Sequence, residues 1–429
     1  MVGGNEGSET IGATVDRSNV NGRHTYHITN YGAKPDGKTD SSKALLEAWM
    51  HACKESRSTV AVTGGEFLLN PVRLSGPCAG PITFAVWGGL KAPEKTFLDS
   101  SEWILFEDLQ SLTVTGNGVL DGQGAYAWSV NQCNVNPNCK PFPTNLKFGN
   151  VVYGRIEGIT SRDSKFFHIV IDEGQHVDIE NIRITAPADS KNTDGIHIGR
   201  SQFVQVNNVN IGTGDDCISL GPGTTNVVIS QVNCGPGHGF SIGSIGKSEN
   251  EDVSGIIVKN CNITNATNGL RIKTWAPSTA SKVYNITYQD ISLNGVQNPI
   301  LIDQHYCPNN QCQHQGESSV EVSDIRYLNI YGSSQDELSA NFNCSGKVPC
   351  KDIEIRRLNI VYNGYQPTKA ACYNFNGKFR KFRENGLPST AEAPPLLAVV
   401  NNQLYAADYA DMEVRRYDKD KKLRCGLLK

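Results

Sequence analysis

Acidic side chains recur at one position of a repeated motif in the middle of the chain. The motif places a polar residue two positions before an alternating apolar, polar, apolar run, as in Asp194-Gly195-Ile196-His197-Ile198-Gly199. Further copies begin at Asp216, His238 and Asn268, after steps of 22, 22 and 30 residues, and Asp215 adds a third carboxylate. Grouped carboxylates of this kind carry out glycoside hydrolysis, in which one protonates the leaving oxygen and another handles the water or the sugar carbon.

A second polar column is expected beside the acids, because strand alternation sends every other side chain to the same face. In each copy the third and fifth residues are apolar and point into a core, so the fourth points outward. The outward residues are His197, Ser219, Ser241 and Arg271, and Lys273 lies just beyond. Stacked strands are ~4.8 Å apart, so these side chains and the acids should converge on one face.

Carboxylates gathered this closely favour a chemical role over a structural one. Like charges in contact raise the pKa of at least one acid, which can then keep its proton at working pH. Arg271 and Lys273 suit a carboxylate on the substrate. Two alternatives are turn-forming Asp residues and a calcium or transition-metal site, which the neighbouring cations disfavour. We therefore expect catalysis with no metal and no cofactor.

The elements that position these residues are short strands that repeat along the chain. Two alternating apolar residues, a two-residue break and two more recur from Val177, Val204, Val227, Ile256 and Ile286, at intervals of 27, 23, 29 and 30 residues. This period is typical of a β-solenoid, in which each coil buries its face only against its neighbours. A β-sandwich would not need such regular recurrence.

The N-terminal part of the repeat region predicts a helix instead of a strand. Thr39-Asp40-Ser41-Ser42 resembles an N-cap, and Leu45, Trp49 and Cys53 then fall on one face of the helix that follows. Such a helix could cap the open end of the solenoid, where strand edges would otherwise pair with other chains.

Composition limits the partners and the compartment. The formal net charge of −3 argues against nucleic acid as a partner, and no long apolar run indicates a membrane span. Thirteen Cys, several in short pairs, and four N-glycosylation sequons favour a secreted, disulfide-bonded protein over zinc sites or buried thiols. The start of the chain lacks an apolar signal core, so this expectation depends on the cysteines and sequons.

Four segments together resemble the signature motifs of the polygalacturonases, glycoside hydrolase family 28. They are Asn192-Thr193-Asp194-Gly195-Ile196-His197, Gly214-Asp215-Asp216-Cys217, Gly237-His238-Gly239 and Arg271-Ile272-Lys273. The resemblance covers about residues 25 to 375. It implies a right-handed parallel β-helix, an inverting mechanism and galacturonate polymers (pectin) as substrate, with the protein acting as a monomer in the cell wall.

The resemblance also implies roles for the matching residues. Asp215 would be the general acid, while Asp194 and Asp216 would hold and deprotonate the attacking water. His238 would support this cluster. Arg271 and Lys273 would bind the galacturonate carboxylate, and His197 is a further candidate for substrate binding.

Flanking segments are most similar to those of plant pollen exopolygalacturonases, which remove single galacturonates from chain ends. They include Gly235-Pro236-Gly237-His238-Gly239 and Asp303-Gln304-His305-Tyr306-Cys307-Pro308. Physical reasoning alone does not decide between this exo action and cleavage within the polymer by an endo-acting enzyme. A calcium-dependent pectate lyase and an inactive pectin-binding wall protein are the alternatives from other classes.

The predicted organisation has three parts: an N-terminal extension over residues 1–24, the catalytic β-helix over 25–389, and an atypical tail over 390–429. The tail departs from the family pattern. Its run from Leu397 to Ala406 resembles a fragment of one kelch propeller blade, and one such fragment cannot close a propeller.

Overall fold

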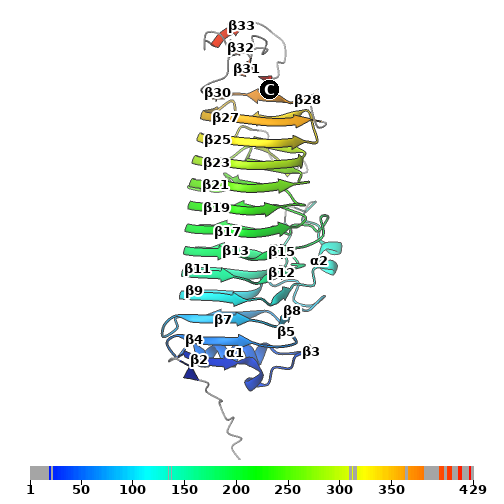
Figure 1. The fold of residues 1–429 in the computed structure, drawn as a ribbon, viewed down its shortest axis with the longest axis vertical. Helices are drawn as coiled ribbons and strands as arrows, with labels where there is room; N and C mark the ends of the chain where they lie inside the picture. Colours follow the sequence, from blue (N-terminus) through cyan, green and yellow to red (C-terminus); the bar gives the residue numbers. More distant parts are fainter. Residues whose placement is uncertain are drawn as a thin grey trace, which may run out of the picture.

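A single stack of parallel coils forms the protein (Figure 1). The computed structural model describes residues 23–133, 135–136, 138–308, 312, 316–362 and 366–380, with strand segments 19–20, 396–400, 403–407, 414–417 and 425–426. Most of the predicted N-terminal extension lies outside these residues. Most coils contribute a strand, or part of a longer strand, to each of three sheets, which we call sheets A, B and C.

The bounds of the strands are as follows. Sheet A contains β6 (Val72–Ser75), β13 (Ile169–Asp172), β16 (Ile196–Gly199), β18 (Ile218–Leu220), β20 (Phe240–Ile245), β22 (Asn268–Trp275), β24 (Asn298–Tyr306), β26 (Leu338–Asn343) and β29 (Lys369–Tyr373). Sheet B contains β2 (Arg23–His27), β4 (Ser58–Val62), β7 (Ile82–Val86), β14 (Gln175–Glu180) and β30 (Phe375–Arg380). Sheet C begins with β3 (Asp36–Asp40), β5 (Glu66–Leu68), β8 (Gly89–Lys91), β10 (Val119–Asp121), β12 (Thr160–Arg162) and β15 (Arg183–Thr185).

Longer strands bend from one sheet into the next. From A into B run β9 (Glu102–Gly116) and β11 (Thr144–Glu157). From B into C run β17 (Gln202–Gly212), β19 (Thr225–Cys234), β21 (Val253–Thr264), β23 (Ser281–Val296), β25 (Val320–Ser334) and β27 (Cys350–Tyr362).

The apolar repeat predicted from sequence sets the register of the coils. Val177, Val204, Val227, Ile256 and Ile286 pair directly from strand to strand and none of them is exposed. Full burial of one such side chain stabilises a fold by ~1.5–3 kcal/mol relative to exposure. The predicted solenoid is therefore confirmed, and equivalent residues stack on one another through its interior.

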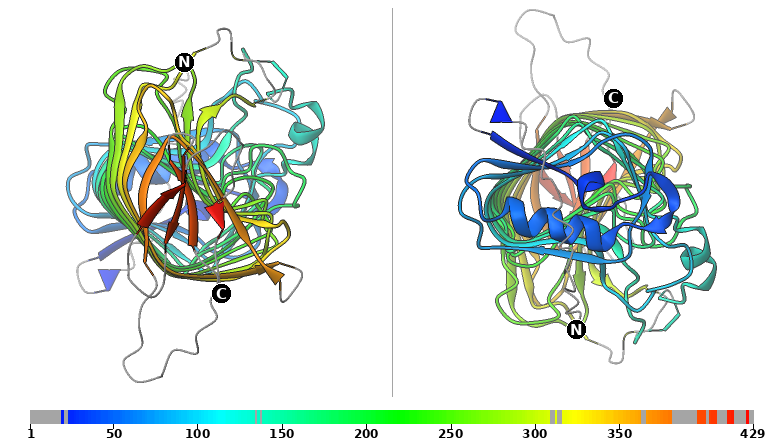
Figure 2. Two further views of the ribbon diagram at one scale, coloured as in Figure 1. Left: turned by 90° about the horizontal axis from the view of Figure 1, so that it is seen from above. Right: turned by 90° about the horizontal axis from the view of Figure 1, so that it is seen from below.

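A helix covers the N-terminal end of the stack, as the sequence predicted. Helix α1 (Ser42–Ala52) lies across the opening in the view from below (Figure 2). Its first turn is held by Asp40, whose carboxylate accepts a 3.0 Å hydrogen bond from the Ser42 backbone N–H. Leu45 and Trp49 are buried, and Cys53, just past the helix, is disulfide-bonded to Cys78. The 3₁₀ turn η1 (Ile28–Tyr31) packs beside it.

Antiparallel pairs occur at both ends of the chain. Strand β1 (Asn19–Val20) pairs with β2, and β28 (Gln366–Pro367) pairs with β27. Beyond the last coil, β31 (Leu396–Val400), β32 (Gln403–Ala407) and β33 (Val414–Tyr417) pair in order, and β34 (Cys425–Gly426) pairs with both β31 and β29.

Disulfide bonds join the three short cysteine pairs noted in the sequence, Cys133–Cys139, Cys307–Cys312 and Cys344–Cys350. A further bond, Cys217–Cys234, lies inside the stack. The prediction that these cysteines form disulfide bonds, and do not bind zinc, is thus confirmed. In the described part of the chain, none of the helices has the length and apolar character needed to cross a bilayer.

Candidate active site

The outward column predicted on sheet A is present in the structure. His197 pairs with Ser219, Ser219 with Ser241, and Ser241 with Arg271, on β16, β18, β20 and β22 in turn. Their apolar neighbours point inward and are at most 3% exposed; these are Ile196, Ile198, Ile218, Leu220, Phe240, Ile242, Leu270 and Ile272. The alternation of buried and outward side chains therefore lines up one polar residue from each coil.

The acids lie in the turns that lead into these strands. The backbone N–H of Gly195 donates to the carbonyl of Asp216 at 2.9 Å, and that of His238 donates to the carbonyl of Asp215 at 2.8 Å. Gly239, next to His238, has φ +75°, and a Cβ there would lie 2.1 Å from the Asn268 carbonyl oxygen. A side chain at that position would push apart the turns that carry His238 and Asn268, so glycine is required for these two coils to stack.

Asp194 is held by a relay that begins at His197. Ser219 Oγ donates to Asp194 Oδ2 at 2.8 Å and lies 2.8 Å from His197 Nδ1. When Asp194 is ionised, the Ser219 proton is directed to it, and His197 Nδ1 then carries a hydrogen and donates it to Ser219. Burial lowers the pKa of His197 to about 4, so the ring is neutral at working pH.

Asp194 is the carboxyl of the cluster whose pKa is raised. Its side chain is buried, and burial, followed by the charges of Asp215 and Asp216, raises its pKa well above the ordinary value. The sequence predicted that one acid of the cluster would have a raised pKa, and this is confirmed. The family resemblance assigns the general-acid role to Asp215. The raised pKa therefore belongs to a neighbour of the expected general acid.

Asp216 is held in the opposite state, as an ionised carboxylate. Arg271 Nη2 donates to Oδ1 at 2.6 Å and Lys273 Nζ donates to Oδ2 at 2.9 Å. Ser241 Oγ also donates to Oδ1, at 2.7 Å, and accepts from Arg271 Nε at 2.9 Å. Burial alone would raise the pKa of Asp216, but the charges of Arg271 and Lys273 outweigh burial and lower it. The side chain is 2% exposed, so these contacts are shielded from water.

Asp215 and His238 form the accessible edge of the cluster. His238 Nδ1 lies 2.9 Å from Asp215 Oδ1, and the two side chains are 36% and 20% exposed respectively. The backbone N–H of Asp216 also donates to Asp215 Oδ1, at 2.9 Å. Of the three carboxylates, Asp215 is therefore the one that a substrate oxygen can approach directly.

A metal ion has a possible site here, but its ligands are already engaged. One atom each of Asp215, Asp216 and His238 lie within 4.8 Å of one another. Both oxygens of Asp216 accept hydrogen bonds from cations, and the His238 nitrogen nearest the acids contacts Asp215. A divalent ion would have to displace these partners and would lie beside two positive charges. The donor set therefore suits proton transfer better than metal binding.

Four further residues contribute to the site without having been assigned roles from the sequence. Ser219 and Ser241 hold Asp194 and Asp216 as described above. They occupy the same position of the repeated motif as His197, and this was the sign in the sequence that they belong to the site. The Phe167 ring centroid is 5.1 Å from that of His197, and Lys273 Nζ is 5.5 Å from the centroid of Tyr306. These rings come from neighbouring coils, and no spacing rule in the sequence connects them to the acids.

An insert docks against the turn that carries Asp194. It contains helix α2 (Ala125–Val130) and projects from the side of the stack near β12 and β15 (Figure 1). Trp128 Nε1 donates to the Ser164 carbonyl at 2.9 Å, and Asn131 Nδ2 donates to Asn192 Oδ1 at 3.0 Å. Lys191 Nζ donates to the Asn131 carbonyl at 3.1 Å. The insert is thus fixed beside the acids, on the side of the N-terminal coils.

Proteins named as polygalacturonases are similar to this chain over most of its length. Over 350 residues the chain is 44% identical to a polygalacturonase of Gossypium barbadense, covering 81% of this chain and 86% of that protein. It is 43% identical over 362 residues to an exopolygalacturonase of Platanus acerifolia, covering 82% and 96%.

Solved structures share the fold and confirm the predicted right-handed β-helix. An endo-xylogalacturonan hydrolase from Aspergillus tubingensis superposes with a TM-score of 0.71 at 23% identity, covering 83% of this chain and 99% of that one. An exopolygalacturonase from Thermotoga maritima gives 0.66 at 18% identity, covering 83% and 92%. The family model of glycosyl hydrolases family 28 matches residues 53–383. The chain therefore belongs to glycosyl hydrolases family 28.

Proposed function

We propose that the protein hydrolyses α-1,4-galacturonosyl linkages of pectin and polygalacturonate by an inverting acid and base mechanism. The observation that carries the proposal is the opposite setting of two buried neighbours: Arg271 and Lys273 contact Asp216 and lower its pKa, whereas burial and the nearby acids raise the pKa of Asp194. Such a pair supplies a proton donor and a proton acceptor at the same pH. Relatives at 43–44% identity with the names polygalacturonase and exopolygalacturonase support the same activity.

In the proposed mechanism the three acids divide the work. Asp215, the accessible carboxyl, protonates the leaving oxygen, and His238 fixes its orientation. Carboxylates this close titrate as one system, so the proton of the group can reside on Asp215 when substrate is bound and leave Asp194 and Asp216 ionised. Asp194 and Asp216 bind the water and take its proton.

The two cations couple substrate binding to the base. Arg271 and Lys273 bind the galacturonate carboxylate, and to do so they must share their hydrogen bonds with Asp216. Because these same charges lower the pKa of Asp216, their engagement by substrate makes Asp216 a stronger base at the moment it is needed. His197 acts through Ser219 to hold Asp194.

We further propose exo action from the non-reducing end. The insert around α2 contacts Asn192, two residues before Asp194, and would block a polymer chain from extending past the acids on that side. Relatives named exopolygalacturonases support this mode. An endo-acting enzyme of the same fold remains the alternative, followed by a pectin-binding wall protein without activity.

The proposal extends to the cellular location, the oligomeric state and the domain organisation. Disulfides such as Cys53–Cys78 and Cys217–Cys234 support a secreted protein of the cell wall. We propose a monomer that acts on pectin chains without a cofactor, nucleic acid or membrane partner. Its parts are the extension over 1–24, the catalytic β-helix over 25–389 and the tail over 390–429.

Product analysis on polygalacturonate, with and without a chelator, tests the proposal. Saturated monogalacturonate released from the first minutes, equally in both conditions, is the expected result. A ladder of oligomers would replace the exo mode by the endo mode. Unsaturated products lost on chelation would indicate a lyase, and binding without any product would indicate the inactive wall protein.

A further inference from the structure

A column of residues with positive φ marks the turn between sheets A and B. Register places one residue of each coil at this position, from β9 through β27. Most coils use small or amide side chains there, namely Ser111, Asn226, Gly255, Asn285, Asp324 and Asp352. Three successive coils instead use Tyr153, His176 and Phe203, with φ of 58°, 54° and 57°. A bulky residue in this conformation is strained, and such outliers gather at functional positions.

The three rings form an exposed aromatic ladder. Tyr153 and His176 stack with centroids 5.1 Å apart, and His176 and Phe203 stack at 4.9 Å. Tyr153 is 60% exposed and Phe203 is 45% exposed. Stacking recovers part of the strain, but it leaves a continuous apolar surface in water, which marks a binding surface.

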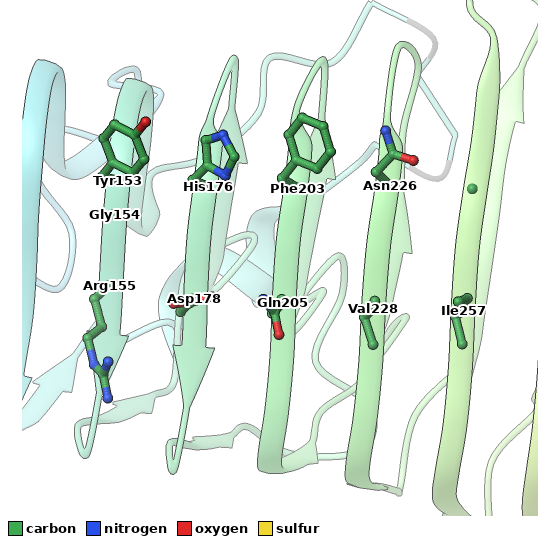
Figure 3. A pocket seen from close by; sticks show the side chains of 11 residues that line it. Tyr153, Gly154, Arg155, His176, Asp178, Phe203, Gln205, Asn226, Val228 and Ile257 are labelled. Atoms are coloured by element: carbon green, nitrogen blue, oxygen red, sulfur yellow. The ribbon is translucent and has the colours of Figure 1, made fainter.

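A groove of about 650 Å³ runs beside the ladder, away from the acids. Figure 3 shows the rings in one row, with Arg155, Asp178, Gln205, Val228 and Ile257 in a second row on the same strands. The volume is in the range of small-ligand sites. Aromatic rings beside amides and hydroxyl-binding groups match a sugar, whose ring faces are apolar and whose rim is polar.

The charges of the groove favour a neutral sugar. Its one cation, Arg155, is already paired with Glu157 and Glu180, and Asp178 adds a further negative charge. A polygalacturonate chain would bring carboxylates to this acidic surface and would be repelled. The groove is therefore poorly suited to the anionic polymer that the active site is proposed to cleave.

A neutral glycan can be attached directly beside the groove. Asn285 stands opposite Gly255, a residue of the groove lining, in the next coil of the same turn column. It begins the sequon Asn285-Ile286-Thr287 and is exposed, and its side chain forms no hydrogen bond with the described residues. Gly255 has no side chain to obstruct the path toward Asn226 and Phe203.

In two other sequons the asparagine amide already forms a hydrogen bond. Asn262 Nδ2 donates to Asn233 Oδ1 at 2.9 Å, within a row of stacked asparagines. Asn343 is followed in its sequon by Ser345, which is fully buried. Asn265 is exposed like Asn285, but it does not adjoin the groove.

We propose that Asn285 carries an N-linked glycan that folds back over Gly255 and lies in the groove against the aromatic ladder. The first sugars pack on Ile257 and Phe203, and their hydroxyls meet Asn226 and Gln205. The glycan covers the exposed rings, which explains why three strained aromatic residues are tolerated on the surface. This is a covalent modification site with an intramolecular binding groove, and it is independent of the catalytic face.

A double-mutant cycle on the full chain, secreted from a glycosylating host, tests the proposal. Thr287→Val removes the sequon, Phe203→Asn shortens the ladder with a residue that the column uses elsewhere, and Thr264→Val is the matched sequon control. Peptide mapping should find Asn285 occupied. Thr287→Val should lower the thermal midpoint by several degrees with the ladder intact and much less with Phe203→Asn, while Thr264→Val should have the same effect in both backgrounds. Activity on polygalacturonate should not change in any variant.

Three results would overturn the proposal. The first is an unoccupied Asn285, and the second is an equal effect of Thr287→Val with and without Phe203. The third uses unglycosylated protein in affinity electrophoresis through pectin and through a neutral galactan. Retention that Phe203→Asn abolishes would show that the groove holds a polysaccharide instead of the protein's own glycan.

Discussion

Two columns of side chains stack along this solenoid at the same strand spacing, and they are stabilised by opposite means. On sheet A, Asp194 and Asp216 are buried and each is held by a serine from the next coil. At the turn into sheet B, Tyr153 and Phe203 are exposed and are held by stacking on His176. A β-helix repeats its backbone and thereby aligns whatever side chains the coils carry. Chemistry arises where the aligned groups are charged and shielded from water, since electrostatic interactions are strongest there.

The column of Asp194, Asp216 and His238 on sheet A, with Asp215 beside it, is called the acid column. The comparison predicts that substitutions in and around it change the rate of hydrolysis far more than the stability of the fold. The largest effect is expected for Asp215→Asn, because Asn cannot protonate the leaving oxygen and general acid catalysis is worth ~10²–10⁴ in rate. Initial rates on polygalacturonate measure the loss, and an unchanged thermal midpoint shows that the fold is intact. Activity within threefold of the original protein would remove Asp215 from the proposed role.

The next largest effect concerns the charge of the substrate. Lys273→Ala removes a cation that contacts Asp216 and that is proposed to bind galacturonate. A hydrogen bond to a charged group is worth ~1.5–3 kcal/mol, so KM on polygalacturonate should rise roughly tenfold to a hundredfold. The effect through Asp216 is common to all substrates, so methyl-esterified chains serve as the control. An equal rise in KM on both would mean that Lys273 does not read the carboxylate.

A smaller effect is expected at the serine that links Arg271 to Asp216. Ser241→Ala removes a hydrogen bond that lowers the pKa of Asp216, at a cost of about tenfold in kcat/KM. Asp216 acts as an ionised carboxylate, so the enzyme loses activity as pH falls through the pKa of Asp216. A higher pKa therefore moves the acid limb of the pH profile to higher pH. Ser230→Ala, at a serine bonded to Asn207 on another face, should leave the profile in place.

The acid column could be predicted from sequence and the aromatic ladder could not. Asp194, Asp216 and His238 precede alternating apolar residues, and the apolar residues fix which way the polar ones point. The ladder position varies from Ser111 to Tyr153 to Asn226, and its common property is a positive φ, which residue type does not reveal.

The charge states within the site also required the structure. The sequence predicted a raised pKa in the cluster but not its location at Asp194, which depends on burial. It placed Arg271 and Lys273 near substrate, whereas their contacts with Asp216 depend on how neighbouring coils stack. Helix α1 was predicted because its cap and its buried face are both local in sequence.

A chelator separates proton transfer from metal catalysis on the acid column. EDTA should leave hydrolysis unchanged, because Asp216 is neutralised by Arg271 and Lys273 without an ion. Rates with EDTA, and with calcium restored, provide the measurement. Activity that falls with EDTA and returns with calcium would assign the Asp215, Asp216 and His238 group to a metal.

The end of the solenoid differs from both columns, because its strands are antiparallel and lie beyond the last coil. Strand β34 covers the free edge of β29 over two residue pairs, Lys369 with Gly426 and Ala370 with Cys425. Exposed edges invite pairing with other chains, so this contact could protect the stack. A hairpin such as β31–β32 is marginal alone in water, so the tail needs that contact more than the catalytic coils do.

The smallest effect is therefore expected from deleting residues 390–429. The acids lie on β16 to β22 and their turns, several coils from β29, so kcat and KM should not change. Two residue pairs of edge contact are few, and we expect the thermal midpoint to move by no more than about 2 °C, a fraction of 1 kcal/mol in a fold of this size. A second deletion, of residues 396–417, keeps β34 and removes the other three tail strands. Aggregation or a drop of several degrees in the first deletion, restored in the second, would show that β34 caps the solenoid and that the tail belongs to the fold.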